Sequence, residues 1–351
     1  MTATTSGTTA TATPPTPTPP TPTPPTARAL GVMLPREIPP ADVGRVARAC
    51  EAAGFDEVWV VEDCFFTGGL TTAAIVLAAT TSVTVGIGIL PAVVRNPAFT
   101  AMELATLAGA FPGRVHAGIG HGVASWMHQV GAAPASWLTS IRETTDAVRD
   151  LLHGRTVTTS GDYVRLDDVR LQFPPTEPPL VSLGVRGPRS VAVAGAHADG
   201  LILAEPTPPA YVTSARARLD GAAEGSAVDG RRRITAYTWA LTGDHVQPAE
   251  RDAVLRARCL DALRDGGIEA HVADLPEHVR THLAAVADGS VELSDEALDL
   301  LVLRGDAAAV RAGVAARHDA GADCVVLVPP RPERVDVVLA DVAALGATRS
   351  G

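Results

Sequence analysis

The segment Gly184–Ser190 is the strongest candidate for a ligand site, and it reads Gly-Val-Arg-Gly-Pro-Arg-Ser. A glycine-containing turn leads into a helix that we expect to begin at Pro188. The start of a helix leaves backbone N–H groups unpaired at the positive end of its dipole. Arg186, Arg189 and the Ser190 hydroxyl add donors, so the segment predicts a phosphate site. The alternative is an ordinary loop with two solvated arginines.

Glycines interrupt the apolar run Val83–Leu90, which predicts a buried strand. Gly86 and Gly88 lie inside this run, and glycine within a strand often marks a bulge or the close approach of a ligand. A flat aromatic ring could lie on such a backbone. The alternative is that these glycines only make room for packing inside the fold.

Two carboxylates and a thiol follow the predicted strand Glu57–Val61. Glu62 and Asp63 are adjacent, and adjacent residues of an extended strand point to opposite sides, so only one of them faces a site. We select Asp63 as the candidate catalytic residue. Cys64 is interpreted as a small apolar contact, because a nucleophilic thiol needs a base partner and none stands nearby in the sequence.

Further polar groups follow the other predicted strands. Gly120, His121 and Gly122 end the strand Arg114–Ile119, and a histidine between two glycines is free to reach a ligand. His121 is therefore a second candidate catalytic residue, with a loop histidine that moves no proton as the alternative. Trp126 and Glu205 are candidate substrate contacts; the alternatives are core packing for Trp126 and a solvated loop position for Glu205.

His278 and His282 have the i, i+4 spacing that can bind a metal from one helix face. The segment is charged and contains no H-E-x-x-H motif, so a solvated helix is the better interpretation and no metal site is predicted.

The candidate residues follow apolar strands that alternate with helical patterns. Because such strands are buried on both faces, eight of them in βα units predict a closed parallel (β/α)₈ barrel, a TIM barrel whose site lies at the carboxyl ends of the strands. An open doubly wound sheet is the alternative, but the first strand lacks the G-x-G-x-x-G turn typical of that fold. The strands are expected near residues 30, 57, 83, 114, 180, 200, 235 and 324.

Three segments fall outside this repeat. Residues 1–27 are rich in proline and threonine, which predicts an extended, unpacked tail without a secretory signal. Residues 155–175 contain a β-hairpin pattern around Gly161-Asp162. Residues 246–303 predict a helical insertion, and the helix 307–320 is the last that we expect. The barrel domain is assigned to residues 28–346.

Composition limits the classes of partner. The chain has 351 residues, a formal net charge of −10 and arginine for all 29 of its basic residues. The absence of lysine excludes lysine Schiff-base and P-loop chemistry. The acidic balance argues against nucleic acid and anionic membrane surfaces as partners. Four scattered cysteines and no apolar stretch of about 18 residues favour a cytoplasmic protein.

Taken in order, several of these segments resemble the luciferase-like monooxygenase superfamily, and most of all its branch that uses coenzyme F420, the methylenetetrahydromethanopterin reductase-like and glucose-6-phosphate dehydrogenase-like oxidoreductases. The resemblance runs from about residue 29 to 345 and is weakest in the insertion. It is carried by Val58–Asp63, Val85–Ile89, Arg95–Pro97, Gly113–Gly122 and Gly187–Gly200.

The resemblance implies a barrel that binds F420 and moves a hydride to or from a small organic substrate. It implies that the deazaflavin ring lies on a bulge of the third strand with a non-proline cis bond at Gly88–Ile89, and that Asp63 faces the coenzyme. Gly187, Arg189 and Ser190 would hold its phosphate, and a homodimer is expected. The full set of expected cofactor contacts is Asp63, Cys64, Gly88, Ile89, Gly120, His121, Gly122, Val185, Arg186, Gly187, Pro188, Arg189 and Ser190.

Two positions depart from the glucose-6-phosphate dehydrogenase-like pattern. Cys64 stands where those enzymes have a histidine, and Val123 stands where they have a glutamate. The proton chemistry of that subgroup therefore does not transfer to this chain. An FMN-dependent monooxygenase using reduced flavin and O₂, and a barrel that has lost its chemistry and acts as a binding protein, remain as alternatives.

Overall fold

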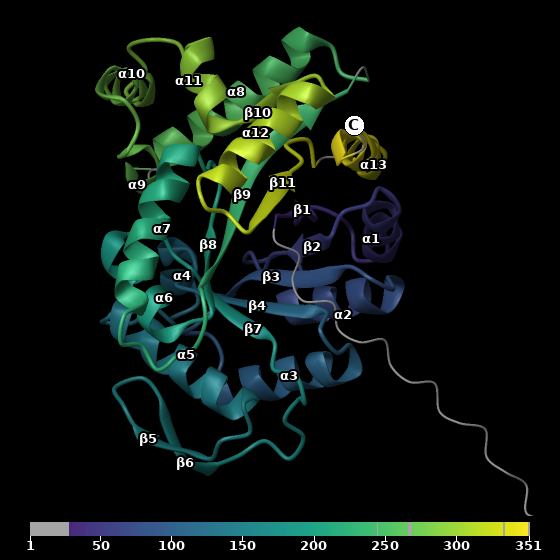
Figure 1. The fold of residues 1–351 in the computed structure, drawn as a ribbon. Helices are drawn as coiled ribbons and strands as arrows, with labels where there is room; N and C mark the ends of the chain where they lie inside the picture. The colour runs from purple at the N-terminus through teal and green to yellow at the C-terminus, as the bar shows by residue number, and fades with distance from the viewer. Residues whose placement is uncertain (1–27, 244, 266–268, 333, 350–351) are drawn as a thin grey trace, which may run out of the picture.

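A closed barrel of parallel strands forms the centre of the protein (Figure 1). The computed structural model describes residues 28–349 except 244, 266–268 and 333, so the predicted tail lies outside the described residues. The sheet closes because β11 pairs with both β1 and β9, and β9 also pairs with β8. The predicted TIM barrel is therefore confirmed, and the open sheet is wrong. Within the described residues the eight barrel strands are β1 (Ala29–Met33), β2 (Glu57–Val60), β3 (Thr84–Pro91), β4 (Val115–Gly120), β7 (Leu180–Gly184), β8 (Gly200–Leu203), β9 (Arg233–Thr242) and β11 (Cys324–Val328).

Helices surround the barrel, and α3 begins with a side-chain cap. Asn96 accepts a hydrogen bond from the backbone N–H of Ala98 at the start of α3, and Pro97 is its first residue, where its missing N–H costs nothing. The expectation that the last helix ends near residue 320 is wrong, because α13 follows β11 and packs beside α1. The surrounding helices are α1 (Val43–Ala52), α2 (Gly69–Ala79), α3 (Pro97–Ala110), α5 (Trp137–Leu152), α6 (Pro188–His197), α7 (Pro209–Ala223), α12 (Ala307–Asp319) and α13 (Val335–Gly346).

Aromatic rings fill the barrel interior. The fully buried ring of Trp59 makes edge contacts with His116 and Tyr237, with ring centroids 4.9 Å and 5.6 Å apart. A Cβ atom at Gly86 would lie 2.2 Å from the Trp59 ring, and one at Gly88 would lie 2.4 Å from the Tyr237 hydroxyl. Both glycines of β3 therefore make room for interior rings, as the packing interpretation of this strand requires.

A buried ion pair lies deeper in the barrel. Arg233 binds the carboxylate of Glu57, which also accepts hydrogen bonds from the indole of Trp59 (2.9 Å) and the thiol of Cys324 (3.3 Å). Burying a charge without partners costs free energy of folding. The two added donors lower this cost for the ion pair in the barrel interior.

The two irregular segments lie at opposite ends of the molecule (Figure 1). The predicted hairpin is confirmed as β5 (Val157–Ser160) and β6 (Arg165–Val169), whose turn is held by the Glu143 carboxylate. The predicted insertion is helical but ends in a strand, because β10 pairs with the second half of β9. Its elements are α8 (Pro248–Asp265), α9 (Glu269–Val272), α10 (Glu277–Ala287), α11 (Asp295–Leu301) and β10 (Leu303–Gly305); α4 (Ala124–Gln129) and the 3₁₀ turn η1 (Ala347–Arg349) complete the elements described.

Glu51 ties α1 to the loop before β3 and predicts how stability depends on pH. Its carboxylate accepts hydrogen bonds from the backbone N–H groups of Thr81 (2.8 Å) and Ser82 (2.7 Å), and the pKa is lowered to about 2. A carboxyl whose pKa is lower in the folded state stabilises the fold above its unfolded pKa, and this stabilisation is lost as the pH falls toward the folded value.

We therefore expect Glu51→Gln to lower the melting temperature at pH 7 and to approach wild type as the pH falls from 4.5 toward 2. Thermal unfolding followed by circular dichroism across this range measures the difference. Glu224→Gln, at an exposed position after α7, is the control and should change little at any pH. A Glu51→Gln deficit that is constant with pH would contradict the assignment.

Candidate active site

The carboxyl ends of β2, β3, β4, β7 and β8 meet at one edge of the barrel. These five strands are parallel and neighbour one another in this order, and β9, β11 and β1 close the rest of the barrel. The segments that follow the five strands therefore gather around one mouth. The predicted site residues all lie in or next to these segments. The structure separates them into a bulge, a pair of bound carboxylates, a cavity at the start of α6 and the loop after β8.

The bulge of β3 is formed by Gly88 and Ile89. The register of β3 against β4 shifts between Ile87 and Leu90, and the peptide bond Gly88–Ile89 is cis, as the family resemblance implies. The Ile89 side chain lies over its neighbouring strands at two glycines. A Cβ atom at Gly120 would lie 2.6 Å from it, and one at Gly184 would lie 2.3 Å from it. Gly120 therefore supports the bulge through its lack of a side chain.

Glu62 and Asp63 bind different arginines, as expected for adjacent residues that point apart. Arg95 makes a two-pronged ion pair with Glu62, one arm at 2.7 Å, and Glu62 also accepts the backbone N–H of Gly69 at 2.8 Å. Arg36 binds Asp63 at 2.7 Å. Glu62 thus fastens the start of α2, whereas the ion pair of Asp63 lies at the partly exposed mouth.

Cys64 keeps its proton in this surrounding. Burial raises the pKa of its thiol, and the charges of Glu62 and Asp63 raise it further. A thiol that stays protonated is a poor nucleophile, which agrees with its interpretation as a small contact. The bond Cys64–Phe65 is also cis, and the side chains of Phe65 and Phe66 that follow are mostly exposed.

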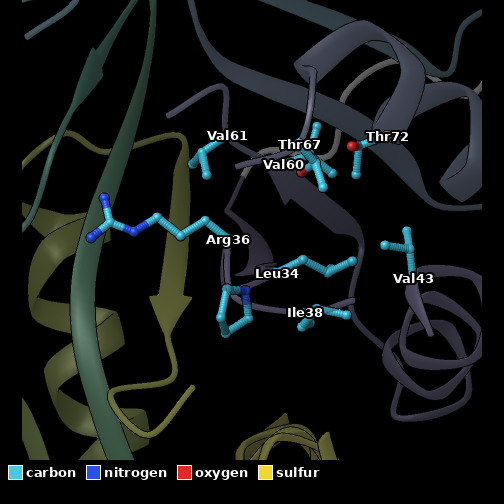
Figure 2. Close-up of a pocket in the computed structure, with 9 residues that line it drawn as sticks. Leu34, Arg36, Ile38, Val43, Val60, Val61, Thr67 and Thr72 are labelled. Carbon is cyan, nitrogen blue, oxygen red and sulfur yellow. The ribbon is translucent and has the colours of Figure 1, made fainter. Parts of the chain in front are cut away.

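A small cavity lies beneath the ends of β1 and β2 (Figure 2). Its volume of about 10 Å³ is close to the least that can hold one water molecule, so the cavity cannot hold a coenzyme. Leu34, Ile38 and Val43 line it, and Figure 2 shows Arg36 extending away from the other labelled side chains. This extended arginine is the one that reaches Asp63, so the cavity is part of the packing behind the site.

A larger cavity of about 380 Å³ opens at the start of α6. Gly187 precedes the helix without a side-chain cap, and a Cβ atom there would have nothing within 4 Å. His121 lies across the cavity, with Nε2 3.2 Å from the Ser190 hydroxyl, and burial lowers its pKa, so its imidazole is neutral at pH 7. The residues that line this cavity are His121, Trp137, Leu138, Gly187, Pro188, Arg189 and Ser190.

Trp137 and Leu138 are lining residues that the sequence analysis missed. Trp137 is the first residue of α5, and its ring makes an edge contact with His121 at 5.9 Å between centroids. The sequence pattern predicts this helix over residues 140–152, so the predicted start is three residues late. The signal that could have found the true start is Ser136, whose hydroxyl accepts the backbone N–H of Thr139 as an N-cap does.

Other predicted residues lie outside this cavity. Val185 is buried, and the carbonyl of Arg186 accepts the Tyr211 hydroxyl at 3.1 Å. Gly122 has φ +72°, a turn conformation that glycine adopts readily. Trp126 is partly buried on α4. Glu205 is partly exposed after β8 and precedes a cis bond to Pro206.

The two spaced histidines of the insertion bind protein groups. His278 contacts Glu296 at 3.0 Å, and Nε2 of His282 accepts the backbone N–H of Ser294 at 3.0 Å. Over the described part of the chain, no group of three or more histidine, cysteine, aspartate or glutamate side chains is arranged to hold a metal ion. In the same residues, no helix is long and apolar enough to cross a membrane.

Fold and site together define a parallel (β/α)₈ barrel with a bulged third strand and an uncapped helix start at its carboxyl edge. The model of the family described as luciferase-like monooxygenase matches residues 13–324. The chain therefore belongs to the luciferase-like monooxygenase family.

Individual relatives are more distant. A 5,10-methylenetetrahydromethanopterin reductase of Methanolobus tindarius is 25% identical over 199 residues, which cover 57% of this chain and 61% of the relative. An F420-dependent glucose-6-phosphate dehydrogenase of Nakamurella multipartita is 28% identical over 186 residues, with 50% and 55% covered. These matches thus span less than two thirds of either relative. The solved structure of an F420-dependent secondary alcohol dehydrogenase in complex with an F420-acetone adduct has a TM-score of 0.73 at 20% identity, covers 92% of this chain and 99% of its own, and shows the shared fold.

The close approach of Ile89 to Gly184 predicts that the bulge needs a glycine at position 184. Gly184→Ala should lower the free energy of unfolding by about 1–3 kcal/mol, because a methyl group there overlaps Ile89. Gly187→Ala is the matched control, since a methyl group there meets open space. Urea unfolding compares the two variants, and equal stabilities would contradict the packing that we describe.

Proposed function

We propose that the protein is an F420-dependent oxidoreductase that transfers a hydride between this coenzyme and a small organic substrate. The observation that carries the proposal is the pairing of two features at one edge of the barrel, the β3 bulge at Gly88–Ile89 and the donor-lined cavity at the start of α6. Family membership and the F420-dependent relatives support the same reading.

The residues present fit such a coenzyme. Arg189, the Ser190 hydroxyl and the free N–H groups after Gly187 would hold an anionic phosphate. The Ile89 bulge would support the ring from one face, and Asp63 at the mouth would face the bound coenzyme. When bound, the deazaflavin supplies hydride chemistry, and the protein supplies binding and orientation. The neutral His121 can donate a hydrogen bond to an anion without bringing a fixed charge.

The first experiment measures which cofactor binds. The purified protein should bind oxidised F420 more tightly than FMN or FAD in a fluorescence or calorimetric titration. Arg189→Ala should weaken F420 binding about tenfold or more, since a lost hydrogen bond between charged groups costs roughly 1.5–3 kcal/mol. Arg170→Ala, at an exposed position beyond β6, is the matched control. Tight binding of FMN with none of F420 would instead favour a flavin-dependent monooxygenase.

We further propose that the protein forms a homodimer through α2 and α3. Helix α2 carries no charged residue, yet it exposes Ile75, and α3 exposes Phe99 and Met102 on one face. The two helices are neighbours, and exposed apolar side chains that gather on neighbouring elements are typical of protein interfaces. A cytoplasmic location also remains a proposal; all four cysteines are unpaired, which suits a reducing compartment.

The double variant Phe99→Glu with Met102→Glu should convert the dimer to a monomer, because two carboxylates would be buried against an apolar partner. Light scattering coupled to size-exclusion chromatography measures the mass. Phe173→Glu, where the side chain is 83% exposed in the loop between β6 and β7, is the control and should leave the dimer intact. A wild-type protein of monomer mass would contradict the proposal.

A further inference from the structure

The imidazole of His121 needs support from outside its own loop. His121 stands between Gly120 and Gly122, which have no side chains to pack against it, and Gly122 adopts φ +72° in a turn. Contacts with other segments must therefore fix the direction of the ring. Ser190 and Trp137 provide such contacts, because Nε2 lies 3.2 Å from the Ser190 hydroxyl and the imidazole lies against the indole ring.

Trp137 holds the imidazole at a defined tilt. The centroids of the two rings are 5.9 Å apart and their planes meet at 84°, which is the edge-to-face arrangement that aromatic rings prefer. Both rings line the cavity of about 380 Å³ at the start of α6, and Ser190 lines it too. The indole is thus placed to set the direction of the imidazole inside this cavity.

The position of Trp137 is itself fixed, because it is the first residue of α5 and the start of this helix is anchored twice. The Ser136 hydroxyl accepts the backbone N–H of Thr139 at 3.3 Å, and the backbone N–H of Ser136 donates to the Tyr163 hydroxyl at 2.5 Å. Tyr163 lies in the turn of the β5–β6 hairpin, and the Glu143 carboxylate on α5 accepts its backbone N–H at 2.9 Å. The hairpin, which lies outside the barrel repeat, therefore helps to hold this wall of the cavity.

The direction of the imidazole decides which group offers a proton to an anion. Burial lowers the pKa of His121, so the neutral ring carries a single proton at pH 7. When this proton is at Nε2, the Ser190 oxygen accepts it, and the Ser190 hydrogen is left to donate into the cavity. When the proton is at Nδ1, Nε2 accepts the Ser190 hydrogen, and the hydroxyl has none left for a ligand.

We propose that Trp137 is a positioning residue, which orients His121 so that Nε2–H donates to the Ser190 hydroxyl and this hydroxyl donates to the phosphate of the bound coenzyme. The inference rests on the proposed function and deepens it. Arg189 supplies the positive charge in the same cavity, whereas the other three side chains supply direction. A hydrogen bond to a charged acceptor is stronger than one between neutral groups, so the orientation of one hydroxyl affects the affinity.

The first test needs no coenzyme. In protein labelled with ¹⁵N in the histidine rings, the signals of His121, identified by their loss in His121→Ala, should show a neutral ring with its proton at Nε2. Trp137→Leu keeps an apolar side chain but removes the ring, so it should shift these signals and mix the two tautomers, while Trp137→Phe should keep the wild-type tautomer. Leu138→Ala, at the next residue of the cavity wall, is the matched control and should leave the tautomer unchanged. A wild-type ring protonated at Nδ1, or signals that do not respond to Trp137→Leu, would overturn the proposal.

The second test is a double-mutant cycle on F420 affinity, measured by calorimetric titration. Trp137→Leu should weaken binding about tenfold, roughly the effect of one net hydrogen bond, whereas Trp137→Phe should weaken it by less than about threefold. In a His121→Ala background, Trp137→Leu should weaken binding by less than about twofold, because Trp137 acts through His121. Additive losses in the cycle would overturn the positioning role. Absence of F420 binding to the wild-type protein would instead overturn the proposed function, and the tautomer of His121 would still decide the role of Trp137.

Discussion

The contact of Ile89 with two neighbouring strands is the constraint on which the candidate site depends. A bulge in a buried barrel strand needs space that the adjacent strands must provide. Gly120 and Gly184 provide it, since a side chain at either position would overlap Ile89. On the inner side, Gly88 leaves room for the Tyr237 hydroxyl. The bulge is therefore held between the packed interior and two strand ends, and the shape of the mouth follows from this packing.

Negative and positive side chains lie at different places along this edge of the barrel. Glu62, which Arg95 binds, also binds the start of α2. Asp63 is bound by Arg36 at the mouth. Positive groups gather instead at the start of α6, where helix N–H groups and Arg189 border an open cavity. An acidic chain can in this way bind an anionic ligand, because local donors and not the net charge decide the interaction.

Sequence patterns predicted much of the fold for physical reasons. Buried parallel strands are apolar throughout, so all eight barrel strands stood out, and the turn residues around Gly161 identified the hairpin. The short strand β10 was not predicted because three residues carry no period, and α13 was not predicted although it follows β11 as the helix of the last βα unit. Trp137 was missed because its role depends on where α5 starts and on packing against His121, 16 residues earlier in the chain.

What the residues of the site do depends more on their partners than on their types. Asp63 and Glu205 are both carboxylates at strand ends, and composition or spacing does not distinguish them. The structure gives Asp63 an arginine at 2.7 Å, whereas Glu205 lies partly exposed after β8, next to the cis bond that joins it to Pro206. Two residues of the same chemical type thus meet different surroundings, because each strand end is followed by a loop of its own sequence. A barrel of this family can accordingly keep its scaffold while the loops after its strands change what the site binds.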